Sequence, residues 1–158
     1  MDKFCDYIDE LSRRHGRDKV FNDFLTIAVC CLSMGKQEEL YFETIKRYTR
    51  EELTTFQEAF AALVIEMDND GKGLKDVLGE YFEEHFYNEK LGQFFTPPSL
   101  CKLMAELNPI EGKNVYDPCC GSGRIFLAAA EKNRKVTFFG GDVSETCCKM
   151  TLINMCLN

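Results

Sequence analysis

The chain has 158 residues, of which 45% are hydrophobic and 28% charged, and its formal net charge is −7. This length predicts one globular domain, alone or with a helical lobe, that buries about two-thirds of its unfolded surface. The composition excludes an intrinsically disordered chain. No apolar run approaches the ~20 residues that a membrane span needs, and the charged stretch before Gly16 is unlike a signal peptide.

The charge is unevenly distributed. Residues 1–92 hold 20 acidic and 12 basic side chains, a net of −8, whereas residues 93–158 hold 6 acidic and 7 basic, a net of +1. An acidic surface repels the phosphate backbone of a nucleic acid. We therefore expect the N-terminal part to be a poor nucleic-acid surface by itself.

Cysteine usage indicates a reducing compartment. Six of the nine cysteines form adjacent pairs, at Cys30-Cys31, Cys119-Cys120 and Cys147-Cys148. The chain has no Cys-x-x-Cys spacing, which disfavours a structural zinc site. We expect reduced thiols that act as small packing residues in a cytoplasmic, prokaryotic protein.

Apolar side chains three and four positions apart predict helices in the first ninety residues. The predicted helices cover about 21–32, 40–45, 53–67 and 74–86, and the third ends in the turn Asp68-Asn69-Asp70-Gly71. This turn resembles a calcium loop that begins at Glu66, but Val77 then occupies the position of the bidentate glutamate. We therefore reject calcium binding and interpret the segment as a solvated turn.

The pattern changes after Gly92. A helix opened by Pro97-Pro98 and ended near Leu107 precedes a strand over 114–116, a glycine turn, a helix over 124–130 and a strand over 136–139. A last helix starts at Ser144. Strand, glycine turn, helix and strand in this order predict a βαβ nucleotide-binding unit. We expect an α/β protein with an N-terminal helical lobe over 1–73 and a Rossmann-like part over 74–158.

The segment Asp117-Pro118-Cys119-Cys120-Gly121-Ser122-Gly123 lies where the first strand turns into a helix. Its two glycines permit a sharp turn and a close approach of a ligand to the backbone. Asp142 follows Gly121 by 21 positions, close to the ~20 expected for an acid that binds ribose hydroxyls. Phe126 replaces the third glycine of the dinucleotide fingerprint, which argues against NAD.

These residues resemble those of a known family. Asp117 to Gly123 is similar to the first S-adenosylmethionine motif of DNA adenine-N6 methyltransferases, and Gly92-Gln-Phe-Phe-Thr-Pro97 resembles the segment that precedes it. Gly141-Asp142-Val143 resembles the second motif, and Asp76-Val77-Leu78-Gly79 also has a counterpart in the modification subunits of type I restriction–modification systems. The resemblance covers residues 74–158 and implies a methyltransferase fold.

The resemblance also implies the roles of individual residues toward S-adenosyl-L-methionine. The segment from Phe95 to Pro97 would line the methionine end, Asp117 would face its ammonium group, Asp142 would bind the ribose and Val143 the adenine ring. The implied cofactor-binding residues are Phe95, Thr96, Pro97, Asp117, Gly121, Ser122, Gly123, Asp142 and Val143.

Other interpretations of the same residues stay open. The two aspartates could cap helices, and Thr96-Pro97-Pro98 could be an ordinary helix entry. Cys119 and Cys120 could be nucleophiles at a helix N-terminus, but the sequence pairs them with no base. We therefore predict no catalytic residue and no metal ligand in this chain.

The family catalyses transfer with an Asn/Asp-Pro-Pro-Tyr/Phe loop that holds a flipped base. The chain's Pro-Pro pair, Pro97-Pro98, lies between Thr96 and Ser99 and cannot be this loop. We expect the chain to be the cofactor-binding part of an adenine-N6 DNA methyltransferase that is inactive alone. The alternatives are a stand-alone cofactor-binding or regulatory protein and a methyltransferase for another substrate.

The implied partners are double-stranded DNA, through the complete enzyme, and a specificity subunit or another modification subunit. We also consider a homodimer. The strand at Val115 and Tyr116 would have one unpaired edge, and the last helix, with Met150, Ile153 and Leu157, would add apolar surface.

Overall fold

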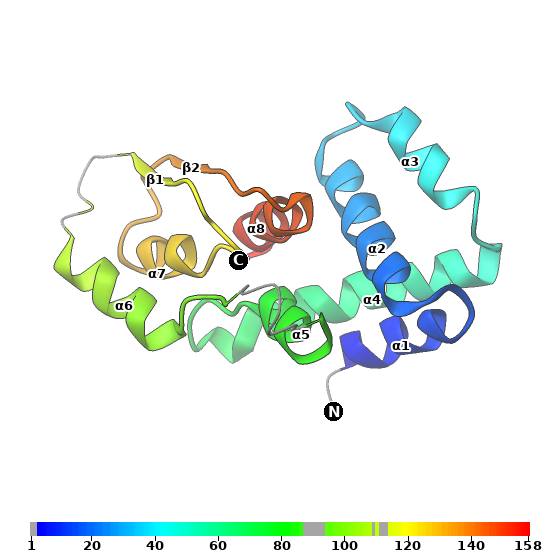
Figure 1. Cartoon of the computed structure of the whole chain (residues 1–158), viewed down its shortest axis with the longest axis horizontal. Helices are drawn as coiled ribbons and strands as arrows, with labels where there is room; N and C mark the ends of the chain where they lie inside the picture. Colours follow the sequence, from blue (N-terminus) through cyan, green and yellow to red (C-terminus); the bar gives the residue numbers. More distant parts are fainter. Residues whose placement is uncertain (1–2, 87–93, 109, 111–113) are drawn as a thin grey trace. The chain divides into compact units, whose positions relative to one another are not determined.

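A computed structural model describes residues 3–86, 94–108, 110 and 114–158 of the chain. The described residues form eight α-helices, one 3-10 helix and two strands (Figure 1). They divide into two compact units, residues 1–66 and residues 67–158. Each unit is described by itself.

All regular secondary structure among the described residues of the first unit is helical. It contains α1 (Lys3–His15), α2 (Arg17–Leu32), α3 (Glu38–Ile45) and most of α4 (Arg50–Asp68). The helices predicted near 21–32, 40–45 and 53–67 are thereby confirmed, whereas α1 was not predicted. Its apolar residues Phe4, Ile8 and Leu11 are buried and follow helical spacing, so the same pattern was present in the sequence.

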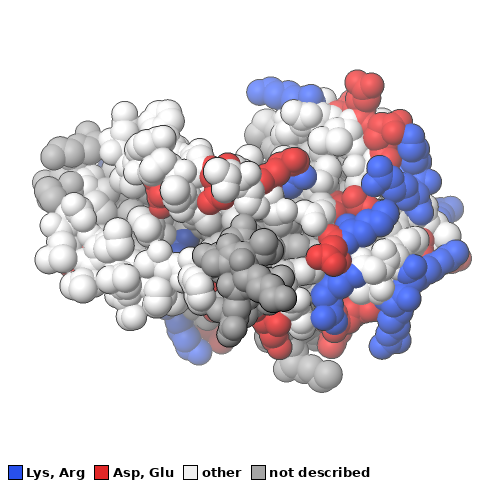
Figure 2. All heavy atoms as spheres, in the orientation of Figure 1, with Lys and Arg blue, Asp and Glu red and all other residues white. Residues whose placement is uncertain are grey.

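Aromatic rings and one carboxylate fill the core of this unit. The ring of Phe24 lies 5.2 Å from that of Phe4 and 6.4 Å from that of Phe56, centroid to centroid. The buried Asp23 accepts hydrogen bonds from the Tyr48 hydroxyl and the Lys19 ammonium group, both at 2.7 Å. On the face shown in Figure 2, acidic and basic side chains are interspersed over this unit. Its acidic excess therefore forms no uniform acidic surface on that face.

The second unit carries the strand–turn–helix–strand sequence. After the 3-10 turn Asn69–Gly71 come α5 (Val77–Phe86) and α6 (Pro98–Leu107), then β1 (Val115–Asp117), α7 (Arg124–Lys132), β2 (Phe138–Gly140) and α8 (Glu145–Leu157). The two strands are parallel, with Val115 opposite Phe138 and Asp117 opposite Gly140. The predicted order of elements is confirmed.

The predicted strand boundaries were wrong by one or two residues. Strand β1 begins at Val115 rather than Asn114 and ends at Asp117, while β2 begins at Phe138 rather than Val136. Pairing across the sheet sets these limits, because the ladder starts where the Val115 amide donates to the Thr137 carbonyl at 3.0 Å. The described residues are thus mostly helical, with a small parallel sheet.

Small residues allow helices to pack closely beside the sheet. Cys101 and Ala105 of α6 pack against Ala128 of α7, and these three side chains are buried. The nine cysteines are free thiols. Four of them are buried as expected of packing residues, but Cys31, Cys119 and Cys156 are exposed, so the packing interpretation was wrong for these three.

Helix α8 differs from the expectation that it adds apolar surface. Met150 and Ile153 are fully buried, and Leu157 is partly buried. Helix α8 packs against α5 and α7 within this unit, which explains the burial. The exposed large apolar side chains of α8 and the sheet are instead Leu152 of α8, at 43%, and Tyr116 and Phe139 of the sheet, at 69% and 51%. No helix among the described residues is long and apolar enough to cross a membrane.

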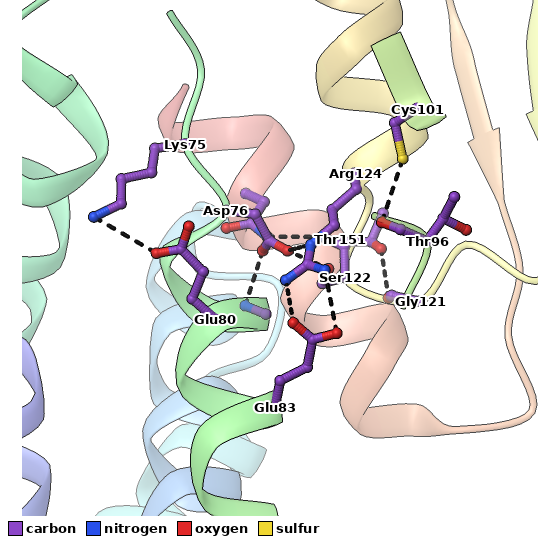
Figure 3. Close-up of polar contacts among 12 residues, drawn as sticks. Lys75, Asp76, Glu80, Glu83, Thr96, Cys101, Gly121, Ser122, Arg124 and Thr151 are labelled. Atoms are coloured by element: carbon purple, nitrogen blue, oxygen red, sulfur yellow. Dashed lines mark hydrogen bonds and ion pairs between the residues drawn. The ribbon is translucent and has the colours of Figure 1, made fainter. Parts of the chain in front are cut away.

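A buried carboxylate joins the parts of the second unit (Figure 3). One oxygen of Asp76 accepts from the Gly79 amide at 2.8 Å and from Asn154 Nδ2 at 2.7 Å. The other accepts from Ser122 Oγ at 2.5 Å and from Arg124 Nε at 2.6 Å. Asp76 is 7% exposed. A buried carboxylate needs such partners, because an unpaired charge in the interior costs several kcal/mol.

Gly79 is the point of closest approach in this network. A Cβ atom at residue 79 would overlap the Asp76 carboxylate and the Ser122 hydroxyl. We expect Gly79→Ala to lower the free energy of unfolding by about 2 kcal/mol or more, although alanine favours a helix over glycine by about 1 kcal/mol. Urea unfolding measures this change.

The neighbouring Glu80 provides the control. Its side chain is 55% exposed and pairs with Lys75 at 3.6 Å, so Glu80→Ala should change the free energy of unfolding by less than about 0.5 kcal/mol. Equal stabilities of the two variants would contradict the close approach at Gly79.

Candidate functional site

A pocket of about 230 Å³ opens beyond the ends of β1 and β2. Its walls come from the segment before α6, the glycine turn after β1 and the turn after β2. The lining residues are Phe94, Phe95, Thr96, Asp117, Cys119, Cys120, Gly121, Ser122, Arg124, Ile125, Asp142, Val143 and Cys147. The carboxyl end of a parallel sheet is the usual place of a ligand site in α/β proteins.

Most of the residues predicted for the site line this pocket together. They are Phe95, Thr96, Asp117, Gly121, Ser122, Asp142 and Val143. Two predicted residues are not among its lining: Pro97 is the N-cap of α6 and Gly123 the N-cap of α7. Pro97 therefore lies at the entry to a helix, as one of the interpretations of Thr96-Pro97-Pro98 expected.

Both glycines of the turn adopt positive φ, at +56° for Gly121 and +92° for Gly123. A Cβ atom at Gly121 would lie 3.0 Å from the Phe95 ring, and one at Gly123 3.2 Å from Thr151 Oγ1. The space that the missing side chains leave is thus filled by the protein's own residues. At these two positions glycine allows the turn and the packing around it.

The two aspartates organise the turns that follow the strands. Asp117 Oδ1 accepts from the Cys119 amide at 2.9 Å. Asp142 Oδ2 accepts from the Gly121 amide at 3.0 Å, and its Oδ1 accepts from the Ser144 amide at 2.9 Å. The N-cap of α8 is Ser144, not Asp142. An ionised carboxylate offers about four acceptor sites, so two hydrogen bonds leave Asp142 capacity for a ligand.

Apolar side chains border the polar turns. Val143 is fully exposed and Phe94 is 70% exposed, and both line the pocket. Phe95 is only partly exposed, because its ring lies 5.5 Å from the Phe82 ring and 5.4 Å from the Arg124 guanidinium carbon. The pocket therefore combines exposed apolar surface with a carboxylate, an arrangement that suits a ligand with a flat ring and hydroxyl groups.

Arg124 is a site residue that the sequence analysis missed. It is the first residue of α7, its side chain is 8% exposed, and it forms a bidentate pair with Glu83 at 3.2 and 2.7 Å. Burial by itself would lower the pKa of the guanidinium group, but the hydrogen bonds to Glu83 and the charge of Asp76 raise it. A positive charge at a helix N-terminus is unfavourable, because the helix dipole is also positive there. The position of Arg124 at the start of α7 was therefore a signal in the sequence that this residue has acidic partners.

The buried thiols of the site are poor nucleophiles. Burial raises the pKa of the Cys147 thiol to about 11 and also raises the pKa of Cys120. A higher pKa lowers the fraction of reactive thiolate at neutral pH. These directions oppose the interpretation of Cys120 as a nucleophile.

The fold and the pocket define a class: a protein with a parallel strand–turn–helix–strand unit, a pocket at the carboxyl ends of the strands, and a carboxylate at the end of β1 and after β2. Residues 74–158 match the model of the N-6 DNA Methylase family. Because this match covers more than half of the chain, the chain belongs to the N-6 DNA methylase family.

Curated relatives agree with this assignment. A type I restriction enzyme MjaIX methylase subunit from Methanocaldococcus jannaschii is 35% identical over 95 residues, which are 52% of this chain and 17% of the relative. A HindI methylase subunit from Haemophilus influenzae is 36% identical over 99 residues, 54% of this chain and 22% of the relative. An MpnII methylase subunit from Mycoplasma pneumoniae is 29% identical over 110 residues, which are 60% of this chain and 20% of the relative.

The matched segments span about a fifth of the length of these relatives. The resemblance to modification subunits of type I systems is thereby confirmed at partial coverage. No solved structure matches the chain.

The exposure of Cys119 and the raised pKa of the buried Cys147 predict which of the two thiols is alkylated first. At pH 8 iodoacetamide should modify the exposed Cys119 at least about tenfold faster than Cys147, whose pKa is raised to about 11. Mass spectrometry of the peptides over time measures both rates. Cys31 and Cys156, also exposed, serve as references. Similar rates at Cys119 and Cys147 in the folded protein would contradict the burial of Cys147.

Proposed function

We propose that residues 74–158 form the S-adenosyl-L-methionine-binding part of an adenine-N6-specific DNA methyltransferase of the type I restriction–modification kind. One observation carries the proposal. Three segments that the sequence resemblance assigned to the cofactor separately, around Phe95, Gly121 and Asp142, line one pocket. In this proposal residues 1–73 are a helical lobe ahead of the cofactor-binding part.

The chemistry of the pocket fits this cofactor. Asp142 retains acceptor capacity for the ribose hydroxyls, and the fully exposed Val143 offers apolar contact for the adenine ring. Asp117 would receive the methionine ammonium group in a charge-assisted hydrogen bond. Phe95, Thr96 and Pro97 would border the methionine end.

The glycine turn would hold the cofactor through its shape. Gly121 and Ser122 line the pocket, and Gly123 sets the start of α7 behind them. The bound cofactor would supply a methyl group for direct transfer to adenine N6. The residues of this chain would bind and orient the donor, which is how positioning lowers the barrier of such a transfer.

The proposed partners are double-stranded DNA, within the complete enzyme, and a specificity subunit or another modification subunit. Homodimer formation through the unpaired edge of β1 is a further proposal. It is supported by the two-stranded sheet, in which β1 pairs with β2 alone among the described residues, and by the exposure of Tyr116 and Phe139 on the sheet. A second candidate function is a stand-alone cofactor-binding or regulatory protein. The net charge of −8 over residues 1–92 favours it, because this charge opposes DNA binding by the chain alone.

Cofactor binding is tested best at Val143. Its side chain is fully exposed, so Val143→Ser should leave the stability unchanged. Loss of apolar contact with adenine should raise the Kd for S-adenosylmethionine about fivefold in calorimetry. Asp142 is a less specific probe, because its carboxylate also holds Gly121 and Ser144.

Leu107→Ser is the matched control, since Leu107 is 73% exposed at the end of α6 and is not among the residues that line the pocket. It should bind the cofactor as the wild type does. Absence of heat from the folded wild-type chain at millimolar cofactor would refute the proposed binding.

The 158 residues alone should transfer no methyl group to DNA. The sequence contains no Asn/Asp-Pro-Pro-Tyr/Phe segment to hold a flipped adenine. Incubation of mixed unmethylated DNA with tritiated S-adenosylmethionine should therefore give incorporation at the background level. Incorporation above background that Val143→Ser reduces would show that this chain is active without that loop.

A further inference from the structure

The guanidinium group of Arg124 is fixed on two sides. Its Nε donates to Asp76 at 2.6 Å, and its two terminal nitrogens donate to Glu83 at 3.2 and 2.7 Å (Figure 3). A guanidinium group held by two carboxylates through three nitrogens cannot rotate without breaking charge-assisted hydrogen bonds. Arg124 is therefore a rigid group at the start of α7.

The guanidinium group of Arg124 lies over the ring of Phe95. The guanidinium carbon lies 5.4 Å from the centre of the Phe95 ring, within the range of a cation–π interaction. The ring of Phe82, from α5, lies 5.5 Å from the same ring, and Gly121 leaves room for it on the turn. Phe95 is thus held by side chains from α5 and α7 and by the glycine turn.

Phe95 needs this support because the segment from Phe94 to Pro97 has neither helical nor strand structure. Phe94, Phe95 and Thr96 form one wall of the pocket. The position of that wall is consequently set by side-chain contacts rather than by a backbone ladder. Arg124 lines the pocket itself and also lies over Phe95, so the residues that hold Arg124 act on the pocket wall through both side chains.

We propose that Glu83 and Asp76 are positioning residues that orient Arg124 so that it fixes Phe95, and that they thereby set the affinity of the pocket for S-adenosylmethionine. This inference rests on the proposed function for its ligand. Glu83 is not among the residues that line the pocket, so its effect on binding is transmitted through Arg124 and Phe95.

Glu83 and Glu80 allow a matched comparison. Both belong to α5, but Glu83 pairs with Arg124 whereas Glu80 pairs with Lys75 at 3.6 Å. Their side chains are 37% and 55% exposed. Glu83→Ala removes one of the two carboxylates that hold Arg124 and leaves Asp76 paired, while Glu80→Ala makes the same chemical change without touching Arg124.

The first measurement needs no cofactor. The chain contains no tryptophan, so Phe95→Trp introduces a single tryptophan at the pocket wall, which can be excited separately from the six tyrosines. In this background Glu83→Ala should shift the emission to longer wavelength and increase quenching by acrylamide, because residue 95 loses its fixed partner. Glu80→Ala should change neither, and Glu83→Gln, which keeps one acceptor for Arg124, should give an intermediate result.

The second measurement is the Kd for S-adenosylmethionine in chains that retain Phe95. Glu83→Ala should raise the Kd about fivefold, as expected for loss of one cation–π contact, and Glu80→Ala should leave it unchanged. Urea unfolding establishes that every variant is folded under the binding conditions. A role in stability alone would alter the unfolding curve but neither the quenching nor the Kd of the folded protein.

The two proposals fail separately. If the wild-type chain does not bind the cofactor, the fluorescence comparison still decides whether Glu83 fixes residue 95. If the wild type binds and the two alanine variants match in quenching and in Kd, the positioning role is refuted while the cofactor site stands.

Discussion

The second unit depends on the burial of one carboxylate, that of Asp76. Its four hydrogen-bond donors come from the start of α5, the glycine turn, the start of α7 and the C-terminal half of α8. Because an uncompensated buried charge is so costly, these four segments are held in one arrangement. The pocket walls belong to the same turn and helix, so the network that supports the fold also sets the shape of the site.

The sequence predicted the parts of the site that depend on local spacing. Gly121 and Asp142 could be found because a turn and a following acid recur at fixed distances along a chain. Arg124 and Glu83 could not be found in this way, since 41 residues separate them and no periodic pattern links the two positions. The segment Asp76-Val77-Leu78-Gly79 was noticed for its resemblance alone, and only the structure shows why Gly79 lacks a side chain.

The family match begins close to Asp76, the buried carboxylate of the second unit. The match begins at residue 74, two residues before Asp76, and includes every donor to its carboxylate. The helical unit has a separate polar centre in Asp23, which accepts from Lys19 and Tyr48. Burial raises the pKa of Tyr48, and the hydrogen bond to Asp23 raises it further. Each unit thus satisfies its buried carboxylate from its own residues.

The sequence separation within the Asp76 network has a consequence for folding during synthesis. Asp76 precedes Asn154, one of its donors, by 78 residues. At ~5–20 residues per second, roughly 4–16 s pass between synthesis of the two residues. During this interval the carboxylate lacks its Asn154 donor and the network is incomplete, whereas the contacts between α1 and α2 are already possible. The helical unit can therefore fold on the ribosome well before the pocket closes around its glycine turn, and a pause in translation near the end of α8 would prolong the exposure of the unfinished core.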